Sequence, residues 1–193
     1  PKQNIFSEYN LDSNKKLIIF LQHPVTTEVD RTVSQIKQSI KAIQTINKKH
    51  VTQAIAIYSN NDAGGKRIIG QLKRSGIKIL PHIVYEDFLN LMKWGGVLVG
   101  NSSSGIHEAP SFGLPVVNIG TRQQFREKGK NVIDVNHDIK EITAAIEKSL
   151  FDAKFIKTAK LARNPYDNGE TAKKVVKILE TIELPPIQKV ITY

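Results

Sequence analysis

The chain has 193 residues, of which 40% are hydrophobic and 24% charged, a balance typical of one globular domain rather than of a disordered segment. It contains no cysteine and no apolar run near the roughly 20 residues of a membrane span, which excludes disulfide bonds, thiolate metal sites and a transmembrane helix. The 28 Lys and Arg residues outnumber the 18 Asp and Glu residues, and the net charge of +10 without any nucleic-acid-binding motif favours a nucleotide as the partner.

The first nine residues contain neither an initiator Met nor a signal-peptide pattern, which indicates a fragment of a longer chain. Short apolar runs then alternate with helical patterns along most of the sequence. The runs predict buried parallel strands at residues 17–21, 54–58, 77–80, 97–99, 115–119 and 131–135. Apolar spacings of three and four, with turn and capping residues, predict helices at 29–46, 65–75, 85–93, 105–111 and 138–149. Thr26 or Thr27 is expected to cap the first of these helices, and Asp138 the last.

Two further helices are predicted at residues 152–162 and 171–181, before a Leu-Pro-Pro sequence that cannot continue a helix. We therefore assign residues 1–183 to one domain and residues 184–193 to a C-terminal tail. Repeated strand–helix–strand units predict an α/β fold, a Rossmann-like parallel sheet with helices on both faces. Because ligands in such folds bind beyond the carboxyl ends of the strands, residues just after a strand are the candidates for a site.

Residues 100–108, Gly-Asn-Ser-Ser-Ser-Gly-Ile-His-Glu, follow the fourth predicted strand and open a helix. Free N–H groups in the first helical turn, together with small Ser and Gly side chains, suit a phosphate group. Glu108 lies one turn beyond Ser104, where a carboxylate is suited to the two hydroxyls of a ribose rather than to phosphate. An ordinary Ser-capped helix with a surface Glu is the alternative interpretation of the same residues.

Three other strand ends carry polar candidates. His23 follows the first strand and could give a proton or a hydrogen bond to a phosphoryl oxygen, or only shape its loop. Asn60 follows the second strand, where its amide could contact a ligand or only form a turn. Arg122 follows the fifth strand and offers a planar fork for a diphosphate, with a solvated Arg as the alternative. His82, His107 and His137 have no partner at metal-ligand spacing, so no metal site is expected.

The segment from Val99 to Gly105 and the segment from Glu108 to Gln123, with residues 22–28 and 60–64 in the same order, resemble the UDP-N-acetylglucosamine 2-epimerase family. The resemblance extends from about residue 17 to residue 179. The His-Pro-Val-Thr-Thr sequence at 23–27 is more similar to the hydrolysing branch than to the non-hydrolysing one.

The resemblance implies a GT-B architecture, in which two Rossmann-like domains enclose the active site and this chain is the C-terminal, UDP-binding domain. Ser102 and Ser103 would bind the diphosphate, and Glu108 would bind the ribose. Ile83 and Phe88 would enclose the uracil. Carried over position by position, the substrate-binding residues are Asn60, Ile83, Phe88, Ser102, Ser103, Gly105, Glu108 and Arg122, with His23 as the catalytic candidate. His107 stands where relatives often carry Arg.

The family's reaction eliminates UDP to give a 2-acetamidoglucal, and water then adds to yield N-acetylmannosamine. Its acid/base residues come from the N-terminal domain, so we expect this chain alone to be inactive. The expected partners are the UDP-sugar and the missing N-terminal domain, and no cofactor is expected. The chain could also form a homo-oligomer. The absence of cysteine is compatible with the reducing cytoplasm, which is the expected location. Two alternatives remain at this point: the nucleotide-sugar domain of a GT-B glycosyltransferase, and a nucleotide-binding module without chemistry.

Overall fold

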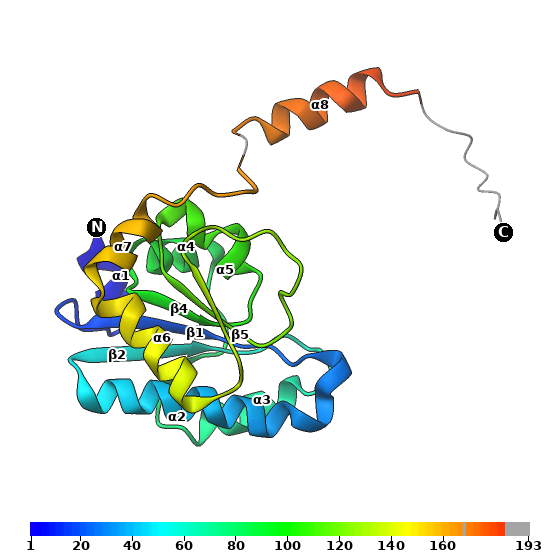
Figure 1. Ribbon diagram of the computed structural model, residues 1–193. Helices are drawn as coiled ribbons and strands as arrows, with labels where there is room; N and C mark the ends of the chain where they lie inside the picture. The colour runs from blue at the N-terminus through cyan, green and yellow to red at the C-terminus, as the bar shows by residue number, and fades with distance from the viewer. Residues whose placement is uncertain (168, 184–193) are drawn as a thin grey trace.

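A six-stranded parallel sheet forms the centre of the computed structural model, which describes residues 1–167 and 169–183 (Figure 1). The strands are β1 (Lys16–Leu21), β2 (Thr52–Ile57), β3 (Lys78–Leu80), β4 (Val97–Gly100), β5 (Val116–Ile119) and β6 (Val132–Val135). Their order in the sheet is β3-β2-β1-β4-β5-β6, and every neighbouring pair is parallel. All six predicted strands are therefore confirmed. The order reverses between β1 and β4, and doubly wound folds bind their ligands outside the carboxyl ends of the strands at such a point.

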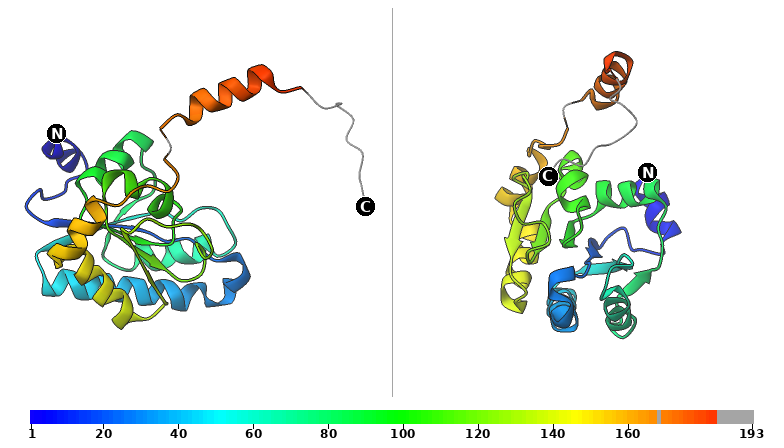
Figure 2. Two further views of the ribbon diagram at one scale, coloured as in Figure 1. Left: turned by 45° about the horizontal axis from the view of Figure 1, so that its top comes forward. Right: turned by 90° about the vertical axis from the view of Figure 1, so that its right-hand side faces the viewer.

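Helices cover both faces of the sheet (Figures 1 and 2). One face carries α2 (Thr32–Lys49), α3 (Gly65–Lys73) and α6 (Ile139–Phe151), and the other carries α1 (Lys2–Glu8), α4 (Tyr85–Trp94), α5 (Ser104–His107) and the 3₁₀ helix η2 (Ala109–Phe112). Side chains of β1 alternate between these two layers: Ile18 and Phe20 pack in one cluster, and Leu17, Ile19 and Leu21 in the other. This two-sided burial explains why the strands have continuous apolar sequences.

The helices depart from prediction in three places. Neither Thr26 nor Thr27 caps α2, which begins at Thr32 after a 3₁₀ helix, η1 (Thr26–Arg31). Glu28 has non-helical φ and ψ of −129° and 27°, which prevents one continuous α-helix there. The single helix expected at 105–111 is divided into α5 and η2, since Pro110 has no N–H to continue the helical ladder. Helix α1 was not predicted, and it buries Ile5 and Phe6.

The two predicted C-terminal helices are confirmed as α7 (Ala153–Lys160) and α8 (Thr171–Thr181). Helix α7 packs beside α6, whereas α8 lies away from the sheet in both views and leaves Val175, Val176, Ile178 and Leu179 exposed (Figures 1 and 2). The predicted tail at 184–193 lies outside the described residues. Among the residues that are described, no helix is long and apolar enough to cross a bilayer.

Asp138 caps α6 as predicted, because its carboxylate accepts hydrogen bonds from the backbone N–H groups of Lys140 and Glu141 at 2.8 and 3.0 Å. We expect Asp138→Ala to lower the free energy of unfolding by about 1 kcal/mol, and Asp138→Asn to restore most of the loss. Urea unfolding followed by circular dichroism measures both. Equal losses in the two variants would show that the cap does not hold this helix end.

Candidate functional site

The loops that follow β1, β4 and β5 meet at the carboxyl edge of the sheet, and the side chain of Asn101 joins two of them. Its Oδ1 accepts a hydrogen bond from the backbone N–H of His23 at 2.7 Å, and its Nδ2 donates to the carbonyl of His23 at 2.9 Å. Asn101 is 1% exposed, so both bonds are shielded from water. The β1 and β4 loops therefore have one fixed relative position.

The third loop is fastened to the same residue. The carbonyl oxygen of Asn101 accepts hydrogen bonds from Arg122 Nη1 at 3.1 Å and from Gln123 Nε2 at 2.9 Å. Arg122 thereby lies beside the β4 turn, as the sequence predicts from its place after β5. Asn101 lies within residues 100–108, but the sequence does not predict this linking role for it. The feature that could indicate this role is a buried Asn directly after a strand, but the sequence alone does not show that Asn101 is buried.

A glycine allows this close approach. Gly100 has φ of +133°, and a Cβ built there would lie 2.0 Å from the carbonyl oxygen of Leu21, a distance that no side chain tolerates. Gly105 is required by packing, because its Cβ would lie 2.8 Å from Val116 Cγ1 on β5, and its contact with a substrate stays a prediction. The two glycines thus set the position of the turn between them.

The imidazole of His23 has a defined hydrogen-bonding state. Its Nδ1 accepts the backbone N–H of Asn60 at 3.1 Å, which places the proton of the neutral ring on Nε2. Burial, and then the positive charge of Arg122, lower the pKa of His23 from 6.5 to about 4, with Asp62 acting in the opposite direction. At neutral pH this side chain is therefore an uncharged donor, rather than the ready proton source that the sequence allows.

Asn60 forms hydrogen bonds through both its backbone and its side chain. Besides the bond to His23, its side-chain Nδ2 donates to Asp62 Oδ2 at 2.5 Å. The amide is thus engaged within the β2 turn, in keeping with the turn-forming alternative. A direct contact with a ligand remains a prediction.

The turn at 101–105 presents unused donors. The backbone N–H groups of Ser102 and Ser103 have no acceptor within residues 1–167 and 169–183. The hydroxyl of Ser102 lies 3.0 Å from that of Ser104. Since α5 has only four residues, these individual N–H and O–H groups, more than a helix dipole, make the turn suitable for an anion.

Glu108 lies one turn beyond Ser104, as predicted, with its N–H bonded to the Ser104 carbonyl at 3.1 Å. Its Oε2 is buried and has no hydrogen-bond partner in the described part of the chain. A buried carboxylate oxygen without a donor is costly, and a hydroxyl group of a ligand would satisfy it.

The apolar candidates lie on another part of the edge. Phe88 is 8% exposed and belongs to the core under α4, and the half-buried Ile83 packs against the same cluster after β3. Phe88 is thus a core residue first, and the contact of either residue with a base stays a prediction. The ring of His107 contacts that of Tyr166 in a tilted arrangement, with ring centroids 4.3 Å apart, and its Nε2 lies 2.9 Å from Arg126 Nη1.

Glu28 is a further link that sequence reasoning did not identify. Its two carboxylate oxygens accept hydrogen bonds from Thr121 Oγ1 at 2.9 Å and from Gln35 Nε2 at 2.5 Å. The bond from Thr121 is the main cause of its lowered pKa. This carboxylate ties η1 and α2 to the β5 loop. Over the described residues, no group of three or more His, Cys, Asp or Glu side chains is placed to hold a metal ion.

Comparisons with known proteins identify the family. The family model of UDP-N-acetylglucosamine 2-epimerase matches residues 2–180. The chain is 34% identical to the UDP-N,N'-diacetylbacillosamine 2-epimerase (hydrolyzing) of Legionella pneumophila, over 94% of this chain and 47% of that protein. It is 35% identical to the UDP-N-acetylglucosamine 2-epimerase of Neisseria meningitidis, over 86% of this chain and 43% of that protein. The chain thus spans about half the length of these relatives.

A solved structure shows the same fold. The crystal structure of UDP-GlcNAc 2-epimerase from Neisseria meningitidis bound to UDP-GlcNAc superposes with a TM-score of 0.73 at 19% identity, covering 93% of this chain and 48% of that one. The Rossmann-like sheet described above is therefore one half of a GT-B architecture, as the sequence predicts.

The lowered pKa of His23 predicts a pH dependence of stability. The imidazole of His23 takes up a proton near pH 6.5 in the unfolded chain but only near pH 4 in the folded chain. The neutral imidazole therefore contributes its full share to the free energy of unfolding above pH 6.5, and this share is lost as the pH falls to 4. The loss is at most about 3 kcal/mol, and the buried His137, whose pKa is also lowered, adds in the same direction. Urea unfolding at neutral pH and at about pH 4.5 measures it. His23→Gln should remove most of the difference; an undiminished acid loss in that variant would contradict the assignment.

Proposed function

The chain belongs to the UDP-N-acetylglucosamine 2-epimerase family, and on that premise we propose that it is the UDP-binding half of an epimerase acting on a UDP-linked, N-acetylated sugar. One observation carries the proposal. The backbone N–H groups of Ser102 and Ser103 are free donors, and the carboxylate of Glu108, one helical turn further along the chain, has an oxygen without a hydrogen-bond partner in the described part of the chain. Donors for a diphosphate and an acceptor for a ribose thus occur in the order in which a nucleoside diphosphate presents its groups.

The diphosphate would be bound by donors from three loops. The N–H groups of Ser102 and Ser103 and the Nε2–H of His23 are uncharged donors, and Arg122 supplies positive charge. Arg122 uses Nη1 on the carbonyl of Asn101, which leaves its other N–H groups for a phosphate oxygen. Because Asn101 fixes all three loops before the ligand arrives, little ordering is needed on binding.

The reaction we propose begins with cleavage of the bond between C1 of the sugar and the β-phosphate oxygen, as a base removes the proton at C2. Negative charge develops on the departing UDP, and donors already aimed at the diphosphate stabilise it. Water then adds to the unsaturated sugar in the hydrolysing form, which releases N-acetylmannosamine when the substrate is UDP-N-acetylglucosamine. In this proposal the base and the acid for these proton transfers come from a second domain, which corresponds to the part of the relatives that this chain does not cover.

His23 has a specific place in this proposal. Its neutral Nε2–H donates a hydrogen bond to the β-phosphate as the C–O bond breaks. The bound diphosphate places negative charge near the ring and raises the pKa of His23 from the value of about 4 that it has in the free chain, so a full proton transfer becomes easier only once the ligand is present.

Calorimetry of the 193-residue chain with UDP tests the binding site. We expect UDP to bind, and Glu108→Gln to weaken binding about tenfold, since a hydrogen bond to a charged group contributes roughly 1.5 kcal/mol or more. UDP lacking the ribose 2′-hydroxyl should bind the unchanged chain more weakly than UDP does, but should bind Glu108→Gln as UDP does. Asp152→Asn, at the start of α7 on the opposite edge of the sheet, is the matched control. Failure of UDP to bind at millimolar concentration would contradict the proposal.

Turnover in the longer protein that contains both halves tests the role of His23. His23→Ala should reduce turnover of UDP-N-acetylglucosamine by about 100-fold while UDP binding changes little, because the contact strengthens as charge develops. The exposed His82, replaced by Ala, serves as the control. Unchanged turnover in His23→Ala would remove this residue from the mechanism. With no acceptor present, release of N-acetylmannosamine also distinguishes an epimerase from a glycosyltransferase.

A further inference from the structure

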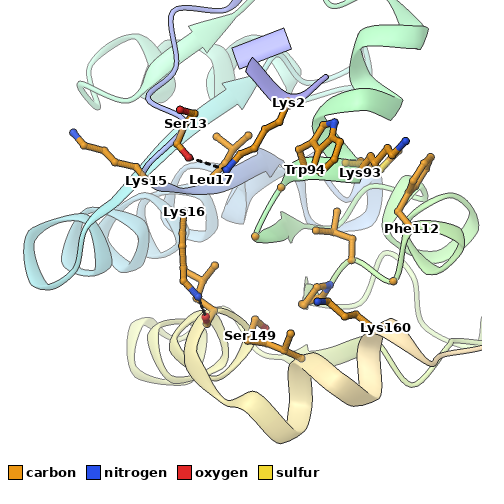
Figure 3. Close-up of a pocket in the computed structure, with 18 of the residues that line it drawn as sticks. Lys2, Ser13, Lys15, Lys16, Leu17, Lys93, Trp94, Phe112, Ser149 and Lys160 are labelled. Atoms are coloured by element: carbon orange, nitrogen blue, oxygen red, sulfur yellow. Dashed lines mark hydrogen bonds between the residues drawn. The ribbon is translucent and has the colours of Figure 1, made fainter. Parts of the chain in front are cut away.

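A pocket lies at the edge of the sheet opposite the carboxyl-edge site, where β1, β4 and β5 begin (Figure 3). It has a volume of about 300 Å³ and is bounded by the starts of these strands and by the ends of α4, α6 and α7. The glycines before β4, Gly95 and Gly96, form part of its wall. None of its lining residues belongs to the carboxyl-edge site, so it is a separate feature of the molecule.

Five lysines line this pocket, and no Asp or Glu does. Lys16 donates to the carbonyl of Leu150, and Lys2 to the carbonyl of Ser13 at 2.7 Å. These acceptors are uncharged, and within residues 1–167 and 169–183 none of the five lysines takes part in an ion pair. Their positive charges are therefore not neutralised by the protein. The full set is Lys2, Lys15, Lys16, Lys93 and Lys160.

Compensation of helix ends is the simplest alternative explanation for these lysines. Helices α4, α6 and α7 all end at the pocket, and lysines commonly occupy the last turn of a helix. Each helix end contributes roughly −0.5 of an elementary charge, or roughly −1.5 for three, which is well below the five positive charges. A positive excess remains after the helix ends have been counted.

The position of Lys160 is set by the backbone. Gly113, at the end of η2, has φ of +60°, and a Cβ built there would lie 2.7 Å from the Cα of Lys160. The last turn of α7 is thus packed directly on this glycine, and Figure 3 shows the Lys160 side chain extending from α7 toward the pocket. Lys15 and Lys93 point outward at the rim in the same view. The pocket is therefore a built part of the fold, with at least one cation held at its wall.

A buried hydroxyl group gives independent evidence for a ligand. Ser149 lines the pocket, is 1% exposed, and its Oγ has no hydrogen-bond partner among the described residues. A buried polar group without a partner is uncommon and destabilising, and a hydroxyl donates readily to an anionic oxygen. Trp94, which is 40% exposed, adds a flat apolar surface at the rim.

We propose that this pocket binds a small multivalent anion that carries phosphate groups. The unneutralised lysines supply charge, the unpartnered hydroxyl of Ser149 supplies a donor among the lining residues, and a volume of about 300 Å³ accommodates a diphosphate but not a folded macromolecule. Two sources share this chemistry, a free diphosphate and the diphosphate of a nucleotide whose ring contacts Trp94.

The sequence provides a direct probe, because Trp94 is the single tryptophan of the chain. Titration of the 193-residue chain with inorganic pyrophosphate at low ionic strength should produce a saturable change in its fluorescence. Lys160→Gln should weaken binding about fivefold, and Ser149→Ala about twofold. Lys37→Gln, which removes an exposed lysine from α2, should leave the affinity unchanged. The same titration with ADP distinguishes the two sources. If ADP binds more tightly than pyrophosphate, the base of the nucleotide contacts Trp94. If the two bind equally, the pocket recognises the phosphate groups alone.

Three results would overturn the proposal. The first is the absence of any saturable change with either probe. The second is an equal loss of affinity in Lys37→Gln and Lys160→Gln, which would show that the response reflects overall charge and not this pocket. A response to a single-stranded oligonucleotide with none to pyrophosphate would likewise assign the lysines to nucleic acid and contradict the proposal. A Trp94 response to pyrophosphate that persists in Arg122→Gln, which removes the charged diphosphate contact proposed for the UDP site, keeps this test separate from that of the UDP site.

Discussion

The geometry of the carboxyl edge depends on one buried side chain, that of Asn101. Its two polar atoms are bonded to the backbone of the β1 loop, and its carbonyl accepts two donors from the β5 loop. Each of these bonds contributes about 1 kcal/mol net, but a partner left unpaired in the interior costs about 1–3 kcal/mol. The three loops therefore cannot adopt independent conformations. The position of Asn101 depends in turn on Gly100, where any side chain would collide with Leu21.

The two proposed anion sites differ in the groups that would bind the anion. The carboxyl edge would use backbone N–H groups, hydroxyls, one neutral imidazole and the guanidinium of Arg122. The five-lysine pocket lies at the other edge. The net charge of +10 suggests a phosphate-bearing ligand, yet the UDP site proposed here relies on few charged groups. Uncharged donors held in place are well suited to a leaving diphosphate, because their alignment need not change as charge develops.

Much of this arrangement could be predicted from the sequence, since it depends on local patterns. Apolar runs identified all six strands, and the rule that ligands bind beyond parallel strands placed His23, Ser102 and Arg122 at one edge. The contacts that define the site could not be predicted in this way. His23 and Asn101 are 78 positions apart, and the link between Glu28 and Thr121 spans 93. The tautomer and lowered pKa of His23 follow from burial and from such contacts, which the sequence does not show.

The central claim is that UDP binds on the turn at 101–105. The most direct measurement is two-dimensional ¹⁵N NMR of the 193-residue chain during titration with UDP. The claim predicts the largest changes at the amide groups of Ser102 and Ser103, with concurrent shifts of the His23 imidazole. Shifts concentrated around Trp94 and Lys160, with the two serine amides unchanged, would contradict it.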